Sequence, residues 1–175
     1  MTASSLVIRA IGAEDWAAYR DARLRMLAEV PIAFTDTLER ARQRGQRAWR
    51  ERVPLAGGVR FAAIDDGAWV GTMGVLRAVS GRERVATLVG VWVAPERRGS
   101  AHGVTDALFA AVEDWAVRLS PVLTLFVHED NARARAAYAR RGFVETGATT
   151  PYPLDPSALE LEMAKRLDRH AVVAR

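Results

Sequence analysis

The sequence predicts an α/β fold of the α+β kind, in which helices pack on a mixed and mostly antiparallel central sheet. Apolar runs with the alternation of strands are interspersed with segments of helical spacing along the 175 residues. Residues 86–127 read as strand, turn, helix and strand, and a crossover of this length makes the two strands parallel and the connection right-handed. One parallel pair is therefore expected near the middle of the sheet.

The chain is expected to open with one strand and two helices. Residues 6–11 read as the strand, and residues 13–15 begin a helix that ends before Pro31. A second helix is expected over residues 37–53, with a loop over 54–58.

A hairpin leads into the central unit. Its strands are expected over 60–64 and 69–78, around a turn at residues 65–67 of sequence Asp-Asp-Gly. Residues 80–82 then turn the chain into the strand at 86–93, which ends at Ala-Pro because proline cannot donate to a strand ladder.

The turn after this strand, residues 97–103, precedes a helix and a second strand at 122–127. Backbone N–H groups of such a turn, together with the free N–H groups of the first helical turn, attract a phosphate or pyrophosphate. An ordinary strand-to-helix turn is the alternative. The helix shows one apolar face, formed by Val104, Leu108, Ala111, Val112, Trp115 and Leu119.

The C-terminal part is expected to hold a helix behind Asn131, a strand that ends near residue 147, a loop at 149–153 and a last strand at 159–163. Residues 1–167 are expected to form one domain, and residues 168–175 a frayed tail.

Asn131 and Tyr138 are seven residues apart, which places them about two helical turns apart and on nearly the same face. Taken singly, Asn131 could be a helix N-cap, for which Asp130 competes, and Tyr138 a half-buried packing residue. Their spacing directly behind a phosphate-type turn favours a shared site.

Two segments resemble the GNAT superfamily of acetyl-CoA-dependent N-acetyltransferases. They are residues 88–99, Leu-Val-Gly-Val-Trp-Val-Ala-Pro-Glu-Arg-Arg-Gly, and Asn131-x-x-Ala134-x-x-x-Tyr138-x-x-x-Gly142-Phe143. The resemblance implies a sheet with one splayed parallel pair and helices on both faces, and acetyl-CoA as a co-substrate.

The resemblance also implies cofactor-binding roles for three groups of residues. Backbone groups of the fourth strand would face the pantetheine arm, the turn would hold the pyrophosphate, and the last helix would face the arm and the thioester sulfur. Carried onto this chain, the residues are Val91, Trp92 and Val93; Arg98, Gly99, Ser100, Ala101, Gly103, Val104 and Thr105; and Asn131, Ala134 and Tyr138.

The turn departs from the family pattern Arg/Gln-x-x-Gly-x-Gly/Ala. Aligned from Arg98, the pattern places polar His102 on a buried helix face, whereas aligned from the helix it leaves the turn two residues longer. We favour the longer turn, because burial of a polar side chain costs more than lengthening a loop. Ser100 then stands where the family has Arg or Gln, and Arg97 or Arg98 would reach the phosphates.

The resemblance implies direct attack of a neutral amine on the thioester. Tyr138 is the expected acid, since it is protonated at neutral pH, and a backbone N–H near Val93 is the expected oxyanion donor. His128 is the first candidate for the base, with a surface loop histidine as the alternative reading. Glu129, Glu83 and a chain of water molecules are the other candidates.

The acceptor site is expected between the N-terminal helices and the loop at 150–153. Phe34, Trp49 and Tyr152 are candidates for contact with the acceptor, although each could be a plain packing residue. A small-molecule amine is the first expectation for the acceptor, and a peptide or protein N-terminus the second.

Composition limits the other classes of function. The net charge of +4 and the arginines within 40–52 could suggest nucleic acid, but base-stacking aromatics are scarce there and a solvated helix face explains the cluster better. We expect no nucleic-acid partner, no membrane segment, no metal and a cytoplasmic location, since the first residues lack the pattern of a signal peptide and cysteine is absent. A homodimer is left open. A silent acyl-CoA-binding module and a nucleic-acid-binding protein are the rival functions.

Overall fold

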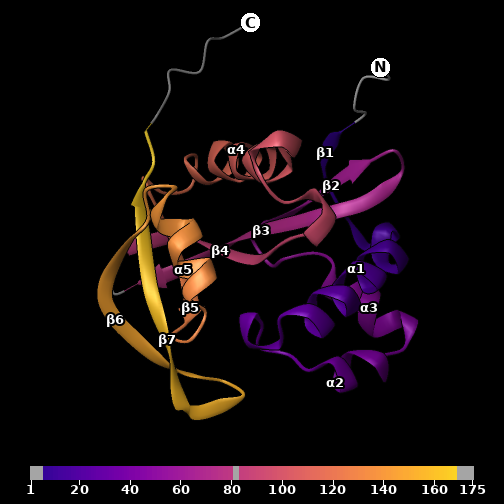
Figure 1. The fold of residues 1–175 in the computed structure, drawn as a ribbon, viewed down its shortest axis with the longest axis horizontal. Helices are drawn as coiled ribbons and strands as arrows, with labels where there is room; N and C mark the ends of the chain where they lie inside the picture. The colour runs from indigo at the N-terminus through magenta and orange to yellow at the C-terminus, as the bar shows by residue number, and fades with distance from the viewer. Residues whose placement is uncertain (1–5, 81–82, 169–175) are drawn as a thin grey trace, which may run out of the picture.

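A computed structural model describes residues 6–80 and 83–168. Seven strands form one sheet in the order β1-β2-β3-β4-β5-β7-β6 (Figure 1). The strands are β1 (Val7–Ala10), β2 (Val59–Asp65), β3 (Ala68–Ser80), β4 (Glu83–Val93), β5 (Val122–His128), β6 (Val144–Tyr152) and β7 (Asp155–Arg166). Residues 81–82 of the expected turn and 169–175 of the expected tail lie outside the described residues.

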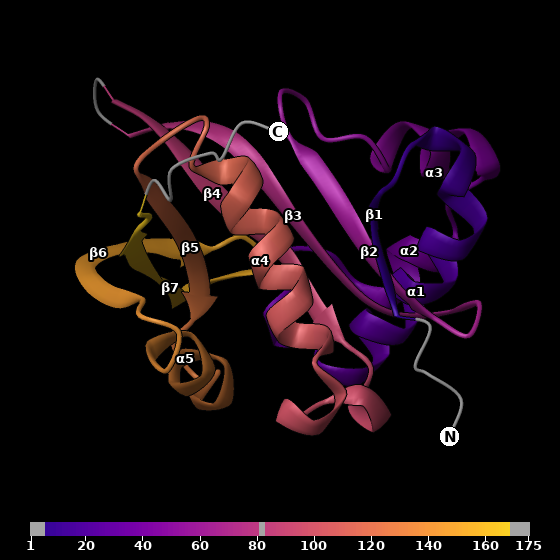
Figure 2. The same ribbon diagram turned by 90° about the horizontal axis from the view of Figure 1, so that it is seen from above.

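The central pair, β4 and β5, is parallel and all other neighbouring strands are antiparallel. The ladder between β4 and β5 is short, with Ala86 opposite Leu123 and Thr87 opposite Thr124. Beyond these residues the two strands separate toward their carboxyl ends, as Figure 2 shows. The mixed sheet with one splayed parallel pair is therefore confirmed.

Helices cover both faces of the sheet. On β3, Gly71 lies against Leu108 of α4 (Val104–Ala116), whereas the hydroxyl of the next residue, Thr72, lies 3.8 Å from the sulfur of Met26 in α1 (Trp16–Glu29). Successive residues of a strand point to opposite faces, so α1 and α4 lie on opposite sides. Figure 1 shows the same arrangement, with α4 on one side of the central strands and the N-terminal helices on the other.

The predicted helix over 37–53 is wrong in one respect, because it is two helices, α2 (Leu38–Arg42) and α3 (Gln46–Arg52). Arg44 lies between them and donates two hydrogen bonds to the carboxylate of Asp36, at 2.7 and 2.9 Å. Gly45 is extended, which ends the helical path and caps α3. A buried ion pair and one glycine thus outweigh a continuous helical pattern.

The predicted loop at 149–153 is also largely strand, since β6 continues to Tyr152. Pro151 lies within β6. Proline has no backbone N–H to donate to a strand ladder. This is tolerated in β6 because β6 is the outer strand of the sheet and one of its edges has no neighbouring strand.

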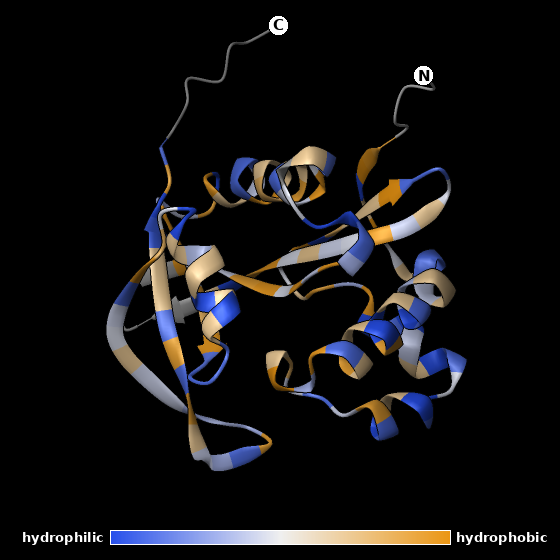
Figure 3. Ribbon diagram, viewed as in Figure 1, coloured by the Kyte–Doolittle hydropathy of each residue, from blue (hydrophilic) through white to orange (hydrophobic). Residues whose placement is uncertain are grey.

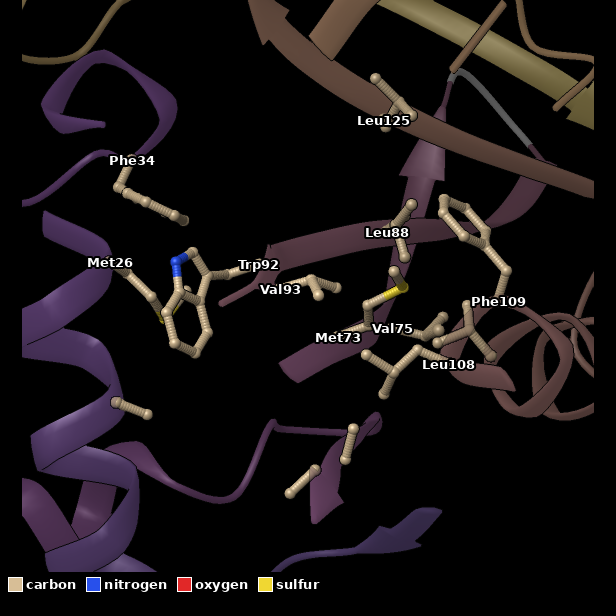
Figure 4. Packing of buried hydrophobic residues seen from close by; sticks show 14 of the residues in the cluster. Met26, Phe34, Met73, Val75, Leu88, Trp92, Val93, Leu108, Phe109 and Leu125 are labelled. Atoms are coloured by element: carbon tan, nitrogen blue, oxygen red, sulfur yellow. The ribbon is translucent and has the colours of Figure 1, made fainter. Parts of the chain in front are cut away.

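The core has two layers, one on each face of the sheet. Leu108 and Phe109 of α4 pack toward the sheet residues Met73, Val75 and Leu88, and Met26 and Phe34 lie beside Trp92 (Figure 4). Burying one such aliphatic side chain stabilises the fold by about 1.5–3 kcal/mol. Figure 3 shows that hydrophilic residues instead gather on the outer turns of the N-terminal helices.

Among the described residues, no helix is long and apolar enough to cross a membrane. The remaining helix, α5 (Ala132–Ala139), lies at the carboxyl end of β5.

Candidate active site

The site begins where β4 leaves β5. The register between β3 and β4 shifts near Gly90, whose φ of +60° is a conformation that favours glycine. The carbonyl of Gly90 accepts a hydrogen bond of 3.0 Å from Thr72. This bulge bends β4 and opens the space between β4 and β5.

Backbone groups of β4 face this space. The N–H of Ala94 bonds to the carbonyl of Val70 on β3, at 2.8 Å. Because strand groups alternate in direction, those of Val93 and, two residues earlier, Val91 point to the opposite edge, where β5 has already separated. The carbonyl of Val93 accepts from Nε of Arg98 at 2.8 Å, and its N–H remains directed at the gap.

The turn before α4 has the longer form that we expected. The helix begins at Val104, which is buried, and His102 lies exposed in the short turn η4 (Ser100–His102). Gly103 has a φ of +64°, and no side chain caps α4. The first N–H groups of α4, including that of Thr105, are therefore available to an anion.

The two arginines of the turn are already engaged. Arg97 pairs with Asp65 at 2.8 Å, and Arg98 pairs with Glu29 of α1 while it holds the carbonyl of Val93. Glu29 also accepts from the indole nitrogen of Trp92, at 3.0 Å. Phosphate contact by either side chain, as the sequence suggested, would require these ion pairs to open.

Helix α5 follows Asn131 and carries Tyr138 near its end. Asn131 is its N-cap, and its side-chain oxygen accepts from the N–H of Ala134 at 3.2 Å. The amide nitrogen of Asn131 is left for another acceptor. The ring of Tyr138 packs edge-on against Phe143, with centroids 5.8 Å apart, and burial raises the pKa of Tyr138 to about 12.

A cavity of about 860 Å³ joins these elements. It extends from the α4 turn along β4 to the N-terminal helices. The predicted site residues that line it are Phe34, Val91, Trp92, Val93, Arg98, Gly99, Thr105, His128, Asn131, Ala134 and Tyr138.

Other predicted residues lie behind or beside the cavity wall. Val104 is packed in the core against β3, and Ala101 and Gly103 belong to the turn. The side chain of Ser100 lies outside the described part of the structure. Trp49 is 1% exposed and packs edge-on against Tyr19, so it is a core residue rather than a cavity residue.

Tyr152 has a supporting position. It is buried, its hydroxyl donates a hydrogen bond of 2.7 Å to the carbonyl of Phe34, and its ring lies edge-on to His128 with centroids 4.8 Å apart. The β6–β7 hairpin is thereby tied to the turn after α1, whose Phe34 lines the cavity.

His128 is buried at the end of β5 and faces Glu160 on β7, its direct partner across the ladder. The Nδ1 atom of His128 accepts the N–H of Asp130 at 3.1 Å, so a neutral ring carries its hydrogen on Nε2. Burial raises the pKa of Glu160, which lines the cavity, while His128 opposes this effect. Glu129 is instead bonded to the backbone N–H of Leu159 at 2.7 Å.

Comparison with known proteins agrees with this geometry. The family model described as the acetyltransferase (GNAT) family matches residues 19–143. The chain belongs to the GNAT acetyltransferase family. Comparison with curated proteins gave no match.

Solved acetyltransferase structures share the fold, including two that match nearly the full chain. A GCN5-related N-acetyltransferase from Kribbella flavida has a TM-score of 0.70 and 22% identity, covering 93% of this chain and 98% of that one. The putative acetyltransferase yncA from Salmonella typhimurium, solved with its cofactor acetyl-CoA, has a TM-score of 0.69 and 21% identity, covering 98% and 99%. Nourseothricin acetyltransferase is 31% identical, with a TM-score of 0.56, over 64% of this chain and 66% of that chain.

Several charged residues that line the cavity were missed from the sequence, among them Glu160, Arg23 and Arg60. Glu160 and Glu162 occupy equivalent positions in an alternating strand pattern, so the sequence does not show which of them faces the cavity. Arg23 and Arg60 are two of many arginines in the chain. The helix after residue 15 carries three arginines, Arg20, Arg23 and Arg25, and the strand at 60–64 carries Arg60, so the sequence does not single out Arg23.

Proposed function

We propose that this GNAT protein transfers the acetyl group of acetyl-CoA to a primary amine of a small molecule by direct attack. The observation that carries the proposal is the gap between β4 and β5. It is flanked by the uncapped start of α4 on one side and by Tyr138 on the other.

The residues present fit the acetyl donor. The backbone groups of Val91 and the N–H of Val93 suit the amide-bearing pantetheine arm, and the N–H groups at the start of α4, from Val104 and Thr105, suit the pyrophosphate. When bound, acetyl-CoA supplies an activated acetyl thioester. The N–H of Val93 would stabilise negative charge on the carbonyl oxygen.

Tyr138 is the acid in this proposal. Tyr138 carries a proton at neutral pH that a leaving thiolate, with a pKa of roughly 8.5, can take up. Burial raises the pKa of Tyr138 to about 12, which makes it a weaker acid than an ordinary tyrosine, so its role depends on its position and not on its pKa. Tyr138 lines the cavity at the end of α5, and its ring position is held by Phe143.

Glu160 and His128 form the base in this proposal, with Glu160 as the proton acceptor. The Nε2 atom of neutral His128 carries a hydrogen and has no free lone pair, so the neutral imidazole is a donor at Nε2 and not a proton acceptor there. A carboxylate with a raised pKa takes up a proton more readily than an ordinary one. His128 then orients and steadies the ionised form of Glu160.

The bridge between the β6–β7 hairpin and the turn after α1 favours a small acceptor over an extended peptide. The bond between Tyr152 and the carbonyl of Phe34 joins the β6–β7 hairpin to the turn after α1. An extended peptide would need a groove that is open at both ends, so that its chain could continue beyond the reacting amine. A small amine needs only the pocket.

The test has two steps. CoA at about 100 times its Kd should stabilise the fold by roughly 2.7 kcal/mol in a denaturation assay, because it binds only the folded protein. A thiol-release assay over small amines and short peptides should then give turnover with the small amines. Lack of any stabilisation at millimolar CoA contradicts the proposal, and binding without turnover on any amine favours the silent acyl-CoA-binding module.

A further inference from the structure

Two arginines are buried in the wall of the cavity at the end away from the α4 turn. Arg23 of α1 and Arg60 of β2 are each 7% exposed, and both line the cavity. The guanidinium of Arg23 stacks on Phe34, 4.4 Å from the ring centre, and that of Arg60 stacks on Tyr19 at 4.6 Å. Aromatic rings hold both cations in place without neutralising them.

These two cations are poorly satisfied by the protein. Nε of Arg23 is buried and bonds to no group in the part of the chain that the structure describes. Arg60 donates from Nε to the carbonyl of Val53 at 3.2 Å, which neutralises no charge. Within residues 6–80 and 83–168, neither guanidinium has a carboxylate at ion-pair distance.

The nearby carboxylate is already used. Asp36 is 5% exposed in its side chain and pairs with Arg44 at 2.7 Å and with Arg52 at 3.6 Å. Arg52 also lines the cavity, so positive charge is in excess at this end. Burial is the largest cause of the lowered pKa of Arg23; Tyr19 and Asp36 oppose it, and Arg60 and Arg52 lower the pKa further by smaller amounts.

Burial of charge without a partner is costly, and buried cations in proteins are normally paired with an anion. A planar guanidinium has a fork of donors that matches a carboxylate or a phosphate. The excess charge and the free donors at this end of the cavity therefore point to an anionic ligand.

The phosphates of CoA do not account for this charge. The pyrophosphate site proposed above is at the start of α4, whereas Arg23 belongs to α1 on the opposite face of the sheet. Arg60 instead approaches the β4 bulge, since its Nη1 lies 3.0 Å from where a Cβ on Gly90 would be. The anion site thus adjoins the acceptor end of β4.

We infer that Arg23 and Arg60 bind the carboxylate of the acceptor, which is therefore an amino acid or a closely similar amino-carboxylate. The inference rests on the proposed acetyl transfer. Glu160 and His128 on another wall of the same cavity receive the amino group, and the arginines receive the carboxylate. The cavity then has one charged wall for each end of a zwitterion.

Matched acceptors test the inference. Thiol release is measured with the twenty common L-amino acids and, for each active one, with its amide, its decarboxylated amine and its aminophosphonate analogue. The amide and the decarboxylated amine, which both lack the carboxylate, should show a kcat/KM about 10- to 100-fold lower than the amino acid. The loss should arise mainly through KM, because a charged hydrogen-bond partner of the arginines is removed. The aminophosphonate shows whether the site prefers a planar or a tetrahedral anion.

Arg23→Met and Arg60→Met should remove the preference for the carboxylate and leave CoA binding unchanged. Arg47→Met is the control, since Arg47 is 93% exposed and, among residues 6–80 and 83–168, its ion pair is with Glu51 on its own helix. Without ligand, Arg23→Met should melt no lower than the wild type, because it removes an unpaired buried charge. This result would separate a binding role from a structural one.

Failure of this inference differs from failure of acetyl transfer. Amides and decarboxylated amines that react as well as the acids, or variants that keep the preference, overturn the carboxylate site and leave the acetyltransferase intact. If no amine reacts, each amino acid is titrated by calorimetry into the CoA-loaded wild-type protein and into the CoA-loaded Arg23→Met protein. Equal heats of binding in the two proteins, or no heat of binding in either, overturn the carboxylate site as well.

Discussion

The two ends of the cavity are built in different ways. We call the donor wall the part formed by Val91, Val93, Thr105, Asn131 and Tyr138, and the acceptor wall the part formed by Arg23, Phe34, Arg60, His128 and Glu160. The donor wall comes from one stretch of chain and offers mainly backbone groups at strand and helix ends. The acceptor wall comes from five elements and offers charged side chains.

This difference explains why amino-acid substitutions should alter ligand binding less at the donor wall than at the acceptor wall. Backbone N–H groups at the start of α4 keep their direction whatever side chains surround them, so the donor wall suits a constant co-substrate. The acceptor wall depends on individual side chains, and a single substitution there changes the charge that a ligand meets. The same acetyl donor at one wall can thus be combined with different acceptor amines at the other.

The largest expected effect is on the donor wall, at Tyr138. Tyr138→Phe keeps the ring against Phe143 and removes the proton, so kcat should fall by roughly 10² to 10⁴. The Kd of acetyl-CoA should change little. Unchanged turnover, with chemistry shown to be rate-limiting by single-turnover kinetics, would assign the acid to another group and leave Tyr138 a packing residue.

The turn before α4 should show the next effect, in stability. Leu108→Ala should cost about 2–5 kcal/mol in urea denaturation, because Leu108 is fully buried against β3. His102→Ala should cost less than about 1 kcal/mol, since His102 is exposed. Equal costs would contradict the longer turn and the donor wall built on it.

Glu160→Gln tests the acceptor wall. It should lower kcat/KM by roughly 10- to 1000-fold through loss of the proton acceptor, with CoA binding unchanged. His128→Asn should have a smaller effect if His128 only orients the carboxylate. A larger loss at His128 than at Glu160 would return the role of base to the imidazole.

Glu160→Gln should also change the dependence of stability on pH. The pKa of Glu160 is raised by burial, so its ionisation opposes folding. Its favourable contribution is complete below the unfolded-state pKa and is lost as the pH rises through the folded-state pKa. Glu160→Gln should therefore raise the melting temperature at pH 7 relative to the wild type, and this gain should vanish under acidic conditions, as calorimetry at both pH values would show.

A small effect is expected at Asn131, where the donor wall and helix stability coincide. Asn131→Ala should cost about 1 kcal/mol of stability through loss of the N-cap bond to Ala134. Asn131→Asp keeps the cap but loses the amide nitrogen. If that nitrogen contacts the donor, Asn131→Asp should weaken acetyl-CoA binding in calorimetry while the melting temperature is retained, and unchanged affinity would make Asn131 a cap alone.

Much of the donor wall could be predicted from the sequence. Strand alternation, the proline after β4, the glycines of the turn and the spacing of Asn131 and Tyr138 are local signals, and backbone geometry follows from them. The start of α4 at Val104 was predictable because burial of His102 would have been costly.

Of the acceptor wall, the sequence indicated Phe34 and His128, whereas its other charged residues were decided by the tertiary structure alone. The break between α2 and α3 depends on Arg44 meeting Asp36, and the extension of β6 through Pro151 depends on its place at the sheet edge. Whether an arginine or glutamate is solvated or buried in a cavity is a property of what surrounds it, and those surroundings come from distant parts of the chain. Local patterns therefore determined the backbone site for the donor, whereas only long-range packing could bring Arg23, Arg60 and Glu160 to one cavity.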